Sequence, residues 1–258
     1  MLINTVILFL RDALPIFVLI AYLSAFLQMS KLWLFLSLST GALLSLIYIN
    51  QIHVISQWFD GIGIELVSWW SQVFIYLLAV ILVLTLPPQK SANKKLGYWV
   101  AGIMVSLTIV SKGSSFILYF DGYLNQNNVL QSMLLGTLLG LGISLSLAIL
   151  LNLGAQGLRR RFGLWTIWLL IIVYSSGQLS NALSLLVQID FISASATAWN
   201  SQSLLSNEFE FGHLFKVLFG YQASPSMTQV YVYALSIAFP LAVFYWFKHH
   251  TPPQKGNQ

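Results

Sequence analysis

Ionisable side chains interrupt two of the apolar stretches in this sequence. Arg11 and Asp12 lie within LFLRDALPIF (residues 8–17), and Lys112 lies within IVSKGSSF (residues 109–116). Charged groups at bilayer depth are costly, so they usually face one another or a polar cavity. We expect these three side chains to form one buried cluster. Such a cluster would line the pathway of an ion or substrate, or it would hold helices together as a structural ion pair.

Two weaker polar features accompany these charges. Gly113, followed by two serines, predicts a soft, polar turn next to Lys112. Gly177, Asn181, Ser184 and Gln188 recur every third or fourth residue, so they lie on one face of a later helix. That polar face would line a path, and hydrogen bonding between helices explains it nearly as well.

The composition is that of an integral membrane protein. Of the 258 residues, 57% are hydrophobic and 7% are charged, against about 25% charged in an average soluble domain. The first apolar run lacks a basic leader and a cleavage site, so it predicts a retained helix. The chain contains no cysteine, which excludes disulfides and thiolate sites. We expect no enzyme, because no span holds paired carboxylates and GTLLGLG (136–142) lies within an apolar run.

The expected fold is a single all-α transmembrane domain. Since a membrane helix needs about 20 apolar residues, we predict seven spans: 2–27, 32–57, 64–86, 97–120, 129–153, 163–189 and 227–247. Residues 190–226 form the only long connection, which we expect to be an extracytoplasmic loop. Residues 248–258 are expected to be a cytoplasmic tail.

The charges predict the orientation. Nine of the twelve basic residues fall on one side of the predicted spans, which the positive-inside rule makes cytoplasmic: Lys31, Lys90, Lys94, Lys95, Arg159, Arg160, Arg161, Lys248 and Lys255. The N-terminus is then outside, the C-terminus inside, and Lys216 outside. The net charge of +5 is therefore a topology signal, and we expect no nucleic-acid partner.

Residues 1–86 and 97–189 form two units of three predicted helices. Because an odd number of helices separates their starts, the second unit enters the membrane inverted. Each unit carries charge near the middle of its first helix, at Arg11-Asp12 and at Lys112. Inverted repeats with a midplane binding site are a recurrent transporter architecture.

Several segments resemble the high-affinity iron permeases, a family of seven-helix membrane proteins. LFLRDALPIFVLIAYL is similar to the first R-E-G-L-E region, and HLFKVLFGYQASPSMTQVYVYALS (213–236) resembles the L-F-G-Y-x-x-x-P-S segment before the last helix. GIELVSWWSQVFIYLLA (63–79) resembles the acidic start of the third helix. RRRFGLWTIWLLIIVYSSGQLSNAL (159–183) resembles the loop and the sixth helix. The resemblance covers nearly the whole chain.

The iron-binding motifs are nevertheless altered. In the family the motif glutamates are thought to bind iron. Here Arg11 keeps the first arginine, while Asp12 and Pro15 stand at the two glutamates. In the second motif Ser111, Lys112 and Ser115 replace the arginine and both glutamates, so that four expected carboxylates become one. We expect an Asp12–Lys112 ion pair to fill the old site.

The resemblance predicts a divergent iron permease homologue of the bacterial inner membrane, either a transporter or a subunit of an iron-uptake complex. The expected pathway residues are Arg11, Asp12, Ser111, Lys112, Ser115 and Asn181, and the candidate metal ligands are Asp12, Glu65 and Asp121. Iron would be the substrate, and no cofactor is predicted. Membrane lipid is one expected partner, and a periplasmic iron-binding or oxidase protein is implied as another. A homo-oligomer is left open.

Two alternatives follow from the altered motifs. In the first, the protein is a structural or regulatory subunit that keeps the fold through the Asp12–Lys112 pair and transports nothing. In the second, the net positive cluster of Arg11, Asp12 and Lys112 carries a small anion, because two cations beside one carboxylate suit an anion better than a metal.

Overall fold

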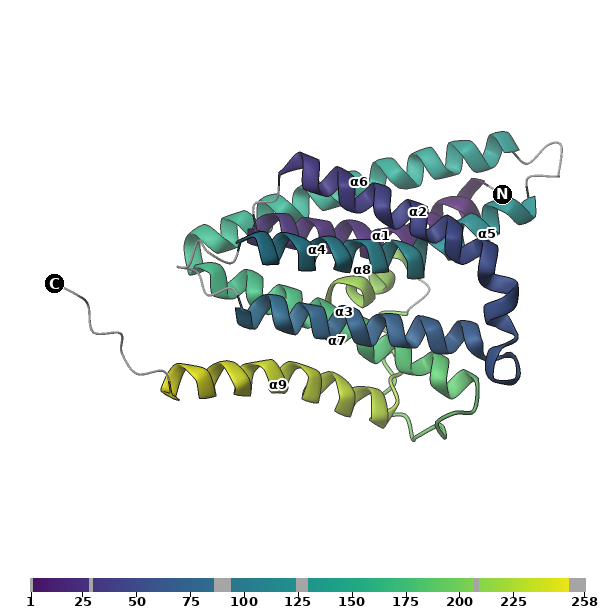
Figure 1. Cartoon of the computed structure of the whole chain (residues 1–258). Helices are drawn as coiled ribbons and strands as arrows, with labels where there is room; N and C mark the ends of the chain where they lie inside the picture. Colours follow the sequence, from purple (N-terminus) through teal and green to yellow (C-terminus); the bar gives the residue numbers. More distant parts are fainter. Residues whose placement is uncertain (1, 28–29, 86–93, 124–129, 207–208, 251–258) are drawn as a thin grey trace.

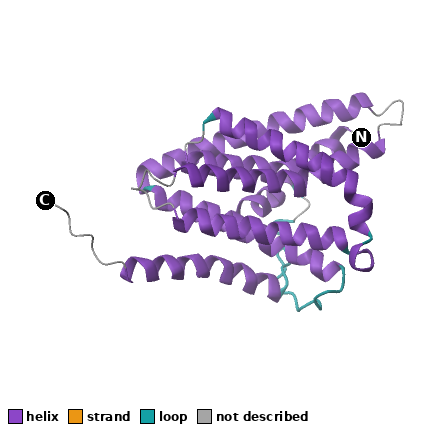
Figure 2. Cartoon of the chain, viewed as in Figure 1, coloured by secondary structure: helices purple, strands orange, loops and turns teal. Residues whose placement is uncertain are grey.

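The computed structural model describes residues 2–27, 30–85, 94–123, 130–206 and 209–250 (Figure 1). Across these ranges the chain is almost entirely helical and contains no β-strand (Figure 2). Residues 251–258 of the expected tail lie outside the described residues. The expected all-α fold class is confirmed.

Seven of the helices are long and apolar enough to cross a membrane. Their order along the chain is α1 (Leu2–Leu27), α2 (Lys31–Ser56), α3 (Gly63–Thr85), α4 (Lys94–Thr108) continued by a π-helical turn η3 (Ile109–Gly113) and α5 (Ser114–Tyr123), α6 (Leu130–Phe162), α7 (Leu164–Gln188) and α9 (Met227–His250). A 3₁₀ turn, η1 (Trp58–Gly61), joins α2 to α3. Six of the seven helices begin and end within about three residues of the predicted spans, as expected when hydropathy sets their length.

The spans form a central group and an outer group around it (Figure 1). The central spans are α1, α3, α7 and the continuous run from α4 to α5, with α1 and α7 the most buried of the seven. Helix α6 packs along α1, α2 packs on α4 and η3, and α9 packs on α7. The outer helices expose large apolar side chains, such as Leu43 on α2 and Leu138 on α6. Such a continuous apolar surface suits contact with lipid.

Small residues let the outer helices approach the inner ones closely. A Cβ atom added at Gly140 of α6 would lie 2.8 Å from the Phe9 side chain of α1. One added at Gly41 of α2 would lie 2.7 Å from the Ile109 side chain of η3. Glycine at a membrane helix interface brings two backbones into contact, and van der Waals packing then stabilises the pair.

Helix α6 is longer than predicted. We expected the fifth span to end at residue 153, before the triple-arginine segment, but the helix continues through that segment to Phe162. The Nη1 atom of Arg159 donates hydrogen bonds to the carbonyl oxygens of Ala25 (2.7 Å) and Phe26 (3.4 Å). The last carbonyls of a helix lack intrahelical partners, so the extension of α6 satisfies the end of α1.

The segment between α7 and α9 is more than a surface loop. It contains an eighth helix, α8 (Glu210–Phe219), which packs against α1 and α7 inside the bundle. Figure 1 shows this short helix between the long ones. Helix α8 ends at Gly220, whose φ of 72° favours glycine. Gly220 also touches α7, because a Cβ at Gly177 would lie 2.5 Å from the Cα of Gly220.

A continuous apolar core fills one half of the bundle. Most of its members come from the C-terminal halves of α1 and α3 and the N-terminal halves of α4 and α7, for example Leu19, Val83, Met104 and Ile171. All four are at most 3% exposed. Apolar side chains therefore fill the space between α1, α3, α4 and α7 in this half of the bundle.

Candidate functional site

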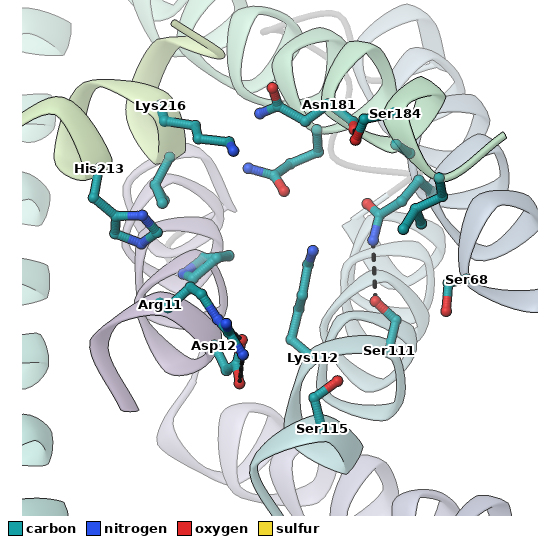
Figure 3. A pocket seen from close by; sticks show the side chains of 16 residues that line it. Arg11, Asp12, Ser68, Ser111, Lys112, Ser115, Asn181, Ser184, His213 and Lys216 are labelled. Carbon is teal, nitrogen blue, oxygen red and sulfur yellow. Dashed lines mark hydrogen bonds and ion pairs between the residues drawn. The ribbon is translucent and has the colours of Figure 1, made fainter. Parts of the chain in front are cut away.

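The other half of the central bundle contains a polar cavity of about 420 Å³, a size typical of small-molecule sites. It lies between α1, α3, α7, α8 and the junction of η3 with α5. The polar and charged lining residues are Arg11, Asp12, Ser68, Gln72, Ser111, Lys112, Ser115, Gln178, Asn181, Ser184, His213 and Lys216. Figure 3 shows their side chains around one space. All six residues expected on a pathway therefore line one cavity, while their role as a pathway stays a prediction.

The cavity also collects the positions that correspond to the two altered motifs. Arg11, Asp12 and Pro15 reach it from α1, and Ser111, Lys112 and Ser115 reach it from η3 and α5. In each segment the residues are one and four positions apart, which keeps them on one helical face. Two segments separated by about 100 residues thus meet at one site.

Asp12 is paired with its neighbour in the sequence. The Nε and Nη2 atoms of Arg11 lie 3.0 and 3.3 Å from the two carboxylate oxygens of Asp12. Asp12 is buried, whereas the side chain of Arg11 is 57% exposed. The expected Asp12–Lys112 ion pair is wrong, because the salt bridge of Asp12 among the described residues is to Arg11. A guanidinium reaches both carboxylate oxygens at once, which a lysine ammonium does not.

The π-helical turn places Lys112 in the wall of the cavity. A π turn widens the helix by one residue, which leaves backbone groups in need of partners. Ser45 of α2 supplies one, since its hydroxyl donates to the carbonyl of Ile109 at 3.1 Å. The ammonium of Lys112 makes no hydrogen bond or ion pair with any described residue, and its side chain extends into the cavity (Figure 3).

Helix α8 contributes a third cation and an imidazole. His213 and Lys216 are one helical turn apart and both face the cavity (Figure 3). Burial lowers the pKa of Lys216, and Arg11 lowers it further. Burial also lowers the pKa of His213, with Lys216 and Arg11 acting in the same direction. His213 is therefore neutral at pH 7, and its buried Nε2 has no hydrogen-bond partner among the described residues.

Amides and hydroxyls complete the lining. The Nε2 of Gln72 donates to the Oγ of Ser111 at 3.0 Å, and the Nε2 of Gln222 donates to the Oδ1 of Asn181 at 2.6 Å. Gln178 is only 7% exposed, and its amide has no hydrogen-bond partner in the described part of the chain. Because Gln178 lines the cavity, its amide is available to hydrogen-bond a ligand there.

The expected metal ligands do not come together. Glu65 lies in the first turn of α3 and does not line the cavity. Asp121 lies in α5, but its side chain is outside the described residues. Across the described ranges, no group of three His, Asp or Glu side chains is close enough to hold a metal ion. The cavity offers one carboxylate, already bound to Arg11, and one imidazole.

Sequence reasoning missed the residues that α8 contributes to the site, and it also missed Ser68, Gln72 and Gln178. Lys216 and His213 were expected in an outer loop, where Lys216 was the one basic residue placed outside. The structure instead puts them opposite Lys112. The available signal was the short apolar run HLFKVLF followed by Gly220, a pattern typical of a helix with a glycine C-cap.

No family model, curated protein or solved structure that we compared with this chain gives a significant match.

Proposed function

We propose that this protein is a membrane transporter that binds a small anion in the cavity between its two halves. The observation that carries the proposal is the charge balance of the site. Three cationic side chains, Arg11, Lys112 and Lys216, face one carboxylate, and Arg11 already neutralises that carboxylate. Two ammonium groups then remain without an opposite charge. Isolated charges away from bulk water are costly, and a bound anion would relieve that cost.

Iron fits this donor set poorly. Iron ions favour several carboxylate or imidazole ligands, and the cavity holds Asp12 and His213 together with three cations. The repulsion between a metal cation and the three cationic groups would oppose binding. We therefore propose that the chain shares the iron-permease architecture, as its segments suggest, and that the site has changed from cation to anion binding.

The packing of the helices supports an inverted repeat. In one proposed unit (α1 to α3) the middle helix α2 packs on α4 and η3 of the other unit, and in the second unit the middle helix α6 packs on α1. The last helices, α3 and α7, pack on each other. A two-fold relation between the units requires each of these pairings. It would place Asp12 and Lys112 at equivalent positions of the two halves.

We propose that the cavity opens outward in a bacterial inner membrane, with the N-terminus outside. The cavity occupies the outer half of the bundle in this orientation, and the apolar core occupies the cytoplasmic half. Alternating movement of the two units would then carry the anion across. Lipid would contact the exposed faces of α2 and α6. We also propose a periplasmic partner protein and leave self-association open; neither proposal is assigned to particular residues.

Ligand-dependent unfolding of the purified protein in nanodiscs tests the anion-binding step. We expect the thermal midpoint to rise with anions from a broad panel and to stay constant with Fe²⁺ or Mn²⁺. Stabilisation by a metal ion and by no anion would indicate that the site binds iron. An unchanged midpoint with every anion would overturn the proposal.

Counterflow of the best-binding anion in proteoliposomes then tests transport. Exchange that exceeds empty liposomes and disappears in the Lys112→Gln variant supports a transporter. Binding without exchange would instead assign the protein to the class of structural or regulatory subunits, for which the packed core beneath the cavity is the supporting observation.

A further inference from the structure

Resting on the proposed anion-binding function, we infer that the ligand of the cavity is a doubly charged oxyanion, such as sulfate, hydrogen phosphate or a small dicarboxylate. The two unpaired lysines set the charge of the ligand. The hydrogen-bond donors around them favour a ligand with several oxygen atoms.

The two lysines approach the cavity from different walls. Lys112 enters from η3 and Lys216 enters from α8, and both side chains end in the space between α1 and α7 (Figure 3). Neither makes an ion pair with a described residue. Asp12 forms no ion pair with either lysine, because both of its oxygens accept from Arg11. A ligand of charge −2 neutralises both positive charges. A monovalent anion would leave one ammonium group without a counter-charge.

The remaining donors favour a polyatomic anion. The amide of Gln178 and the hydroxyl of Ser115 have no hydrogen-bond partner among the described residues, and the Nε2 of His213 is buried and unpaired. These three groups come from α7, α5 and α8, so they surround the cavity and do not cluster at one point. A spherical halide would reach few of them. An oxyanion presents several acceptor oxygens in different directions, and charge-assisted hydrogen bonds to such oxygens are the strong ones.

The walls of the cavity explain why a cation or a neutral solute is a poorer ligand. Positive side chains come from α1, η3 and α8, so a cation meets repulsion from three directions. A neutral solute would leave both ammonium groups unneutralised. A volume of about 420 Å³ accepts an inorganic oxyanion with water, or a dicarboxylate of a few carbons.

The test compares affinities of divalent and monovalent anions for the full-length protein in nanodiscs at constant ionic strength. The divalent probes are sulfate, hydrogen phosphate and succinate, and the monovalent probes are chloride, nitrate and acetate. We expect at least one divalent anion to bind ten or more times as tightly as every monovalent one. Comparison of succinate with the inorganic ions identifies which oxyanion geometry the site prefers.

Two single variants and one control locate the binding. Lys112→Gln and Lys216→Gln are each expected to weaken divalent binding at least tenfold and to reduce the preference for divalent over monovalent anions. Lys95→Gln changes an exposed lysine at the start of α4 and should leave both unchanged. Size-exclusion elution and the midpoint without ligand verify that the variants fold. The Lys112→Gln/Lys216→Gln double variant corrects for general salt effects, because sulfate also stabilises proteins by exclusion from their surface.

The outcomes separate this inference from the proposed function. Equal affinity for monovalent and divalent anions would overturn the doubly charged ligand and leave anion binding intact. A divalent preference that persists in the double variant would overturn the assignment to this cavity. Absence of binding by all six anions would overturn the proposed function itself.

Discussion

At the residue scale, the ion pair of the cavity joins two neighbours in the sequence, Arg11 and Asp12. Arg11 takes both oxygens of Asp12, and side-chain geometry of this kind depends on rotamers that hydropathy does not encode. The consequence is an unpaired Lys112.

Replacement of Lys112 by methionine should stabilise the unliganded protein. A buried charge without a partner is costly, and an apolar side chain of similar length removes that cost, so the free energy of unfolding should rise by about 1 kcal/mol or more. Thermal unfolding without added anion measures the change. A structural Asp12–Lys112 pair would give the opposite sign, a loss of about 3–5 kcal/mol.

The Asp12→Asn variant should bind anions more tightly than the wild type. Among the described residues it removes the one carboxylate that lines the cavity, and it frees Arg11 for the ligand, so the dissociation constant should fall by roughly tenfold. Titration of sulfate into both proteins gives the comparison. An iron site with Asp12 as ligand would instead lose iron binding in this variant and gain no anion affinity.

Anion affinity should rise as the pH falls through the range in which His213 takes up a proton. The lowered pKa of His213 keeps the imidazole neutral in the empty site, and a bound anion favours its protonation. Arg11, Asp12, Lys112 and Lys216 are the charged groups that face it; α3 and α7 contribute only neutral groups to the lining. In His213→Gln the rise should vanish. A pH dependence that survives this substitution would contradict the assignment.

The same lowered pKa reduces the stability of the empty protein in acid. The unfolded chain binds a proton at His213 more readily than the folded chain does, so stability is retained above pH 6.5 and is lost as the pH falls towards the folded pKa. Bound anion should oppose this loss.

Helix α8 is the element that sequence could not place. The seven spans follow from hydropathy, because lipid requires long apolar helices with satisfied backbones. A ten-residue helix between polar segments carries no such requirement. Its position depends on tertiary contact, chiefly the approach of Gly220 to Gly177 of α7. The π turn at Lys112 was anticipated only as a soft turn, since its geometry depends on Ser45 of another helix.

The Gly177→Ala variant should impair the site by displacing α8. The added Cβ would lie 2.5 Å from the Cα of Gly220, and relief of this overlap moves His213 and Lys216 out of the lining. Overpacking of this kind costs about 1–3 kcal/mol, and we expect anion affinity to fall at least tenfold. Gly142→Ala is the matched control, because its Cβ would have nothing within 4 Å. Equal affinities in the two variants would show that α8 does not form the site.

Single-cysteine labelling tests the orientation of the whole molecule. The chain has no cysteine, so each introduced thiol is the only target. Ser203→Cys, in the segment before α8, should react with an impermeant maleimide in intact spheroplasts. Phe162→Cys, 63% exposed at the end of α6, should react only after permeabilisation. The reverse pattern would invert the orientation and with it the direction in which the cavity opens.

The division of the bundle into a polar half and an apolar half also has an electrical consequence. Little of the membrane voltage would fall across a hydrated cavity, because water and ions in it screen the field. Most of the voltage would therefore fall across the packed core alone. Movement of a ligand of charge −2 inward across this thin layer would require about 4.6 kcal/mol per 100 mV of inside-negative voltage. One proton carried with the ligand would halve that requirement. His213, beside the two lysines, is the group placed to hold such a proton.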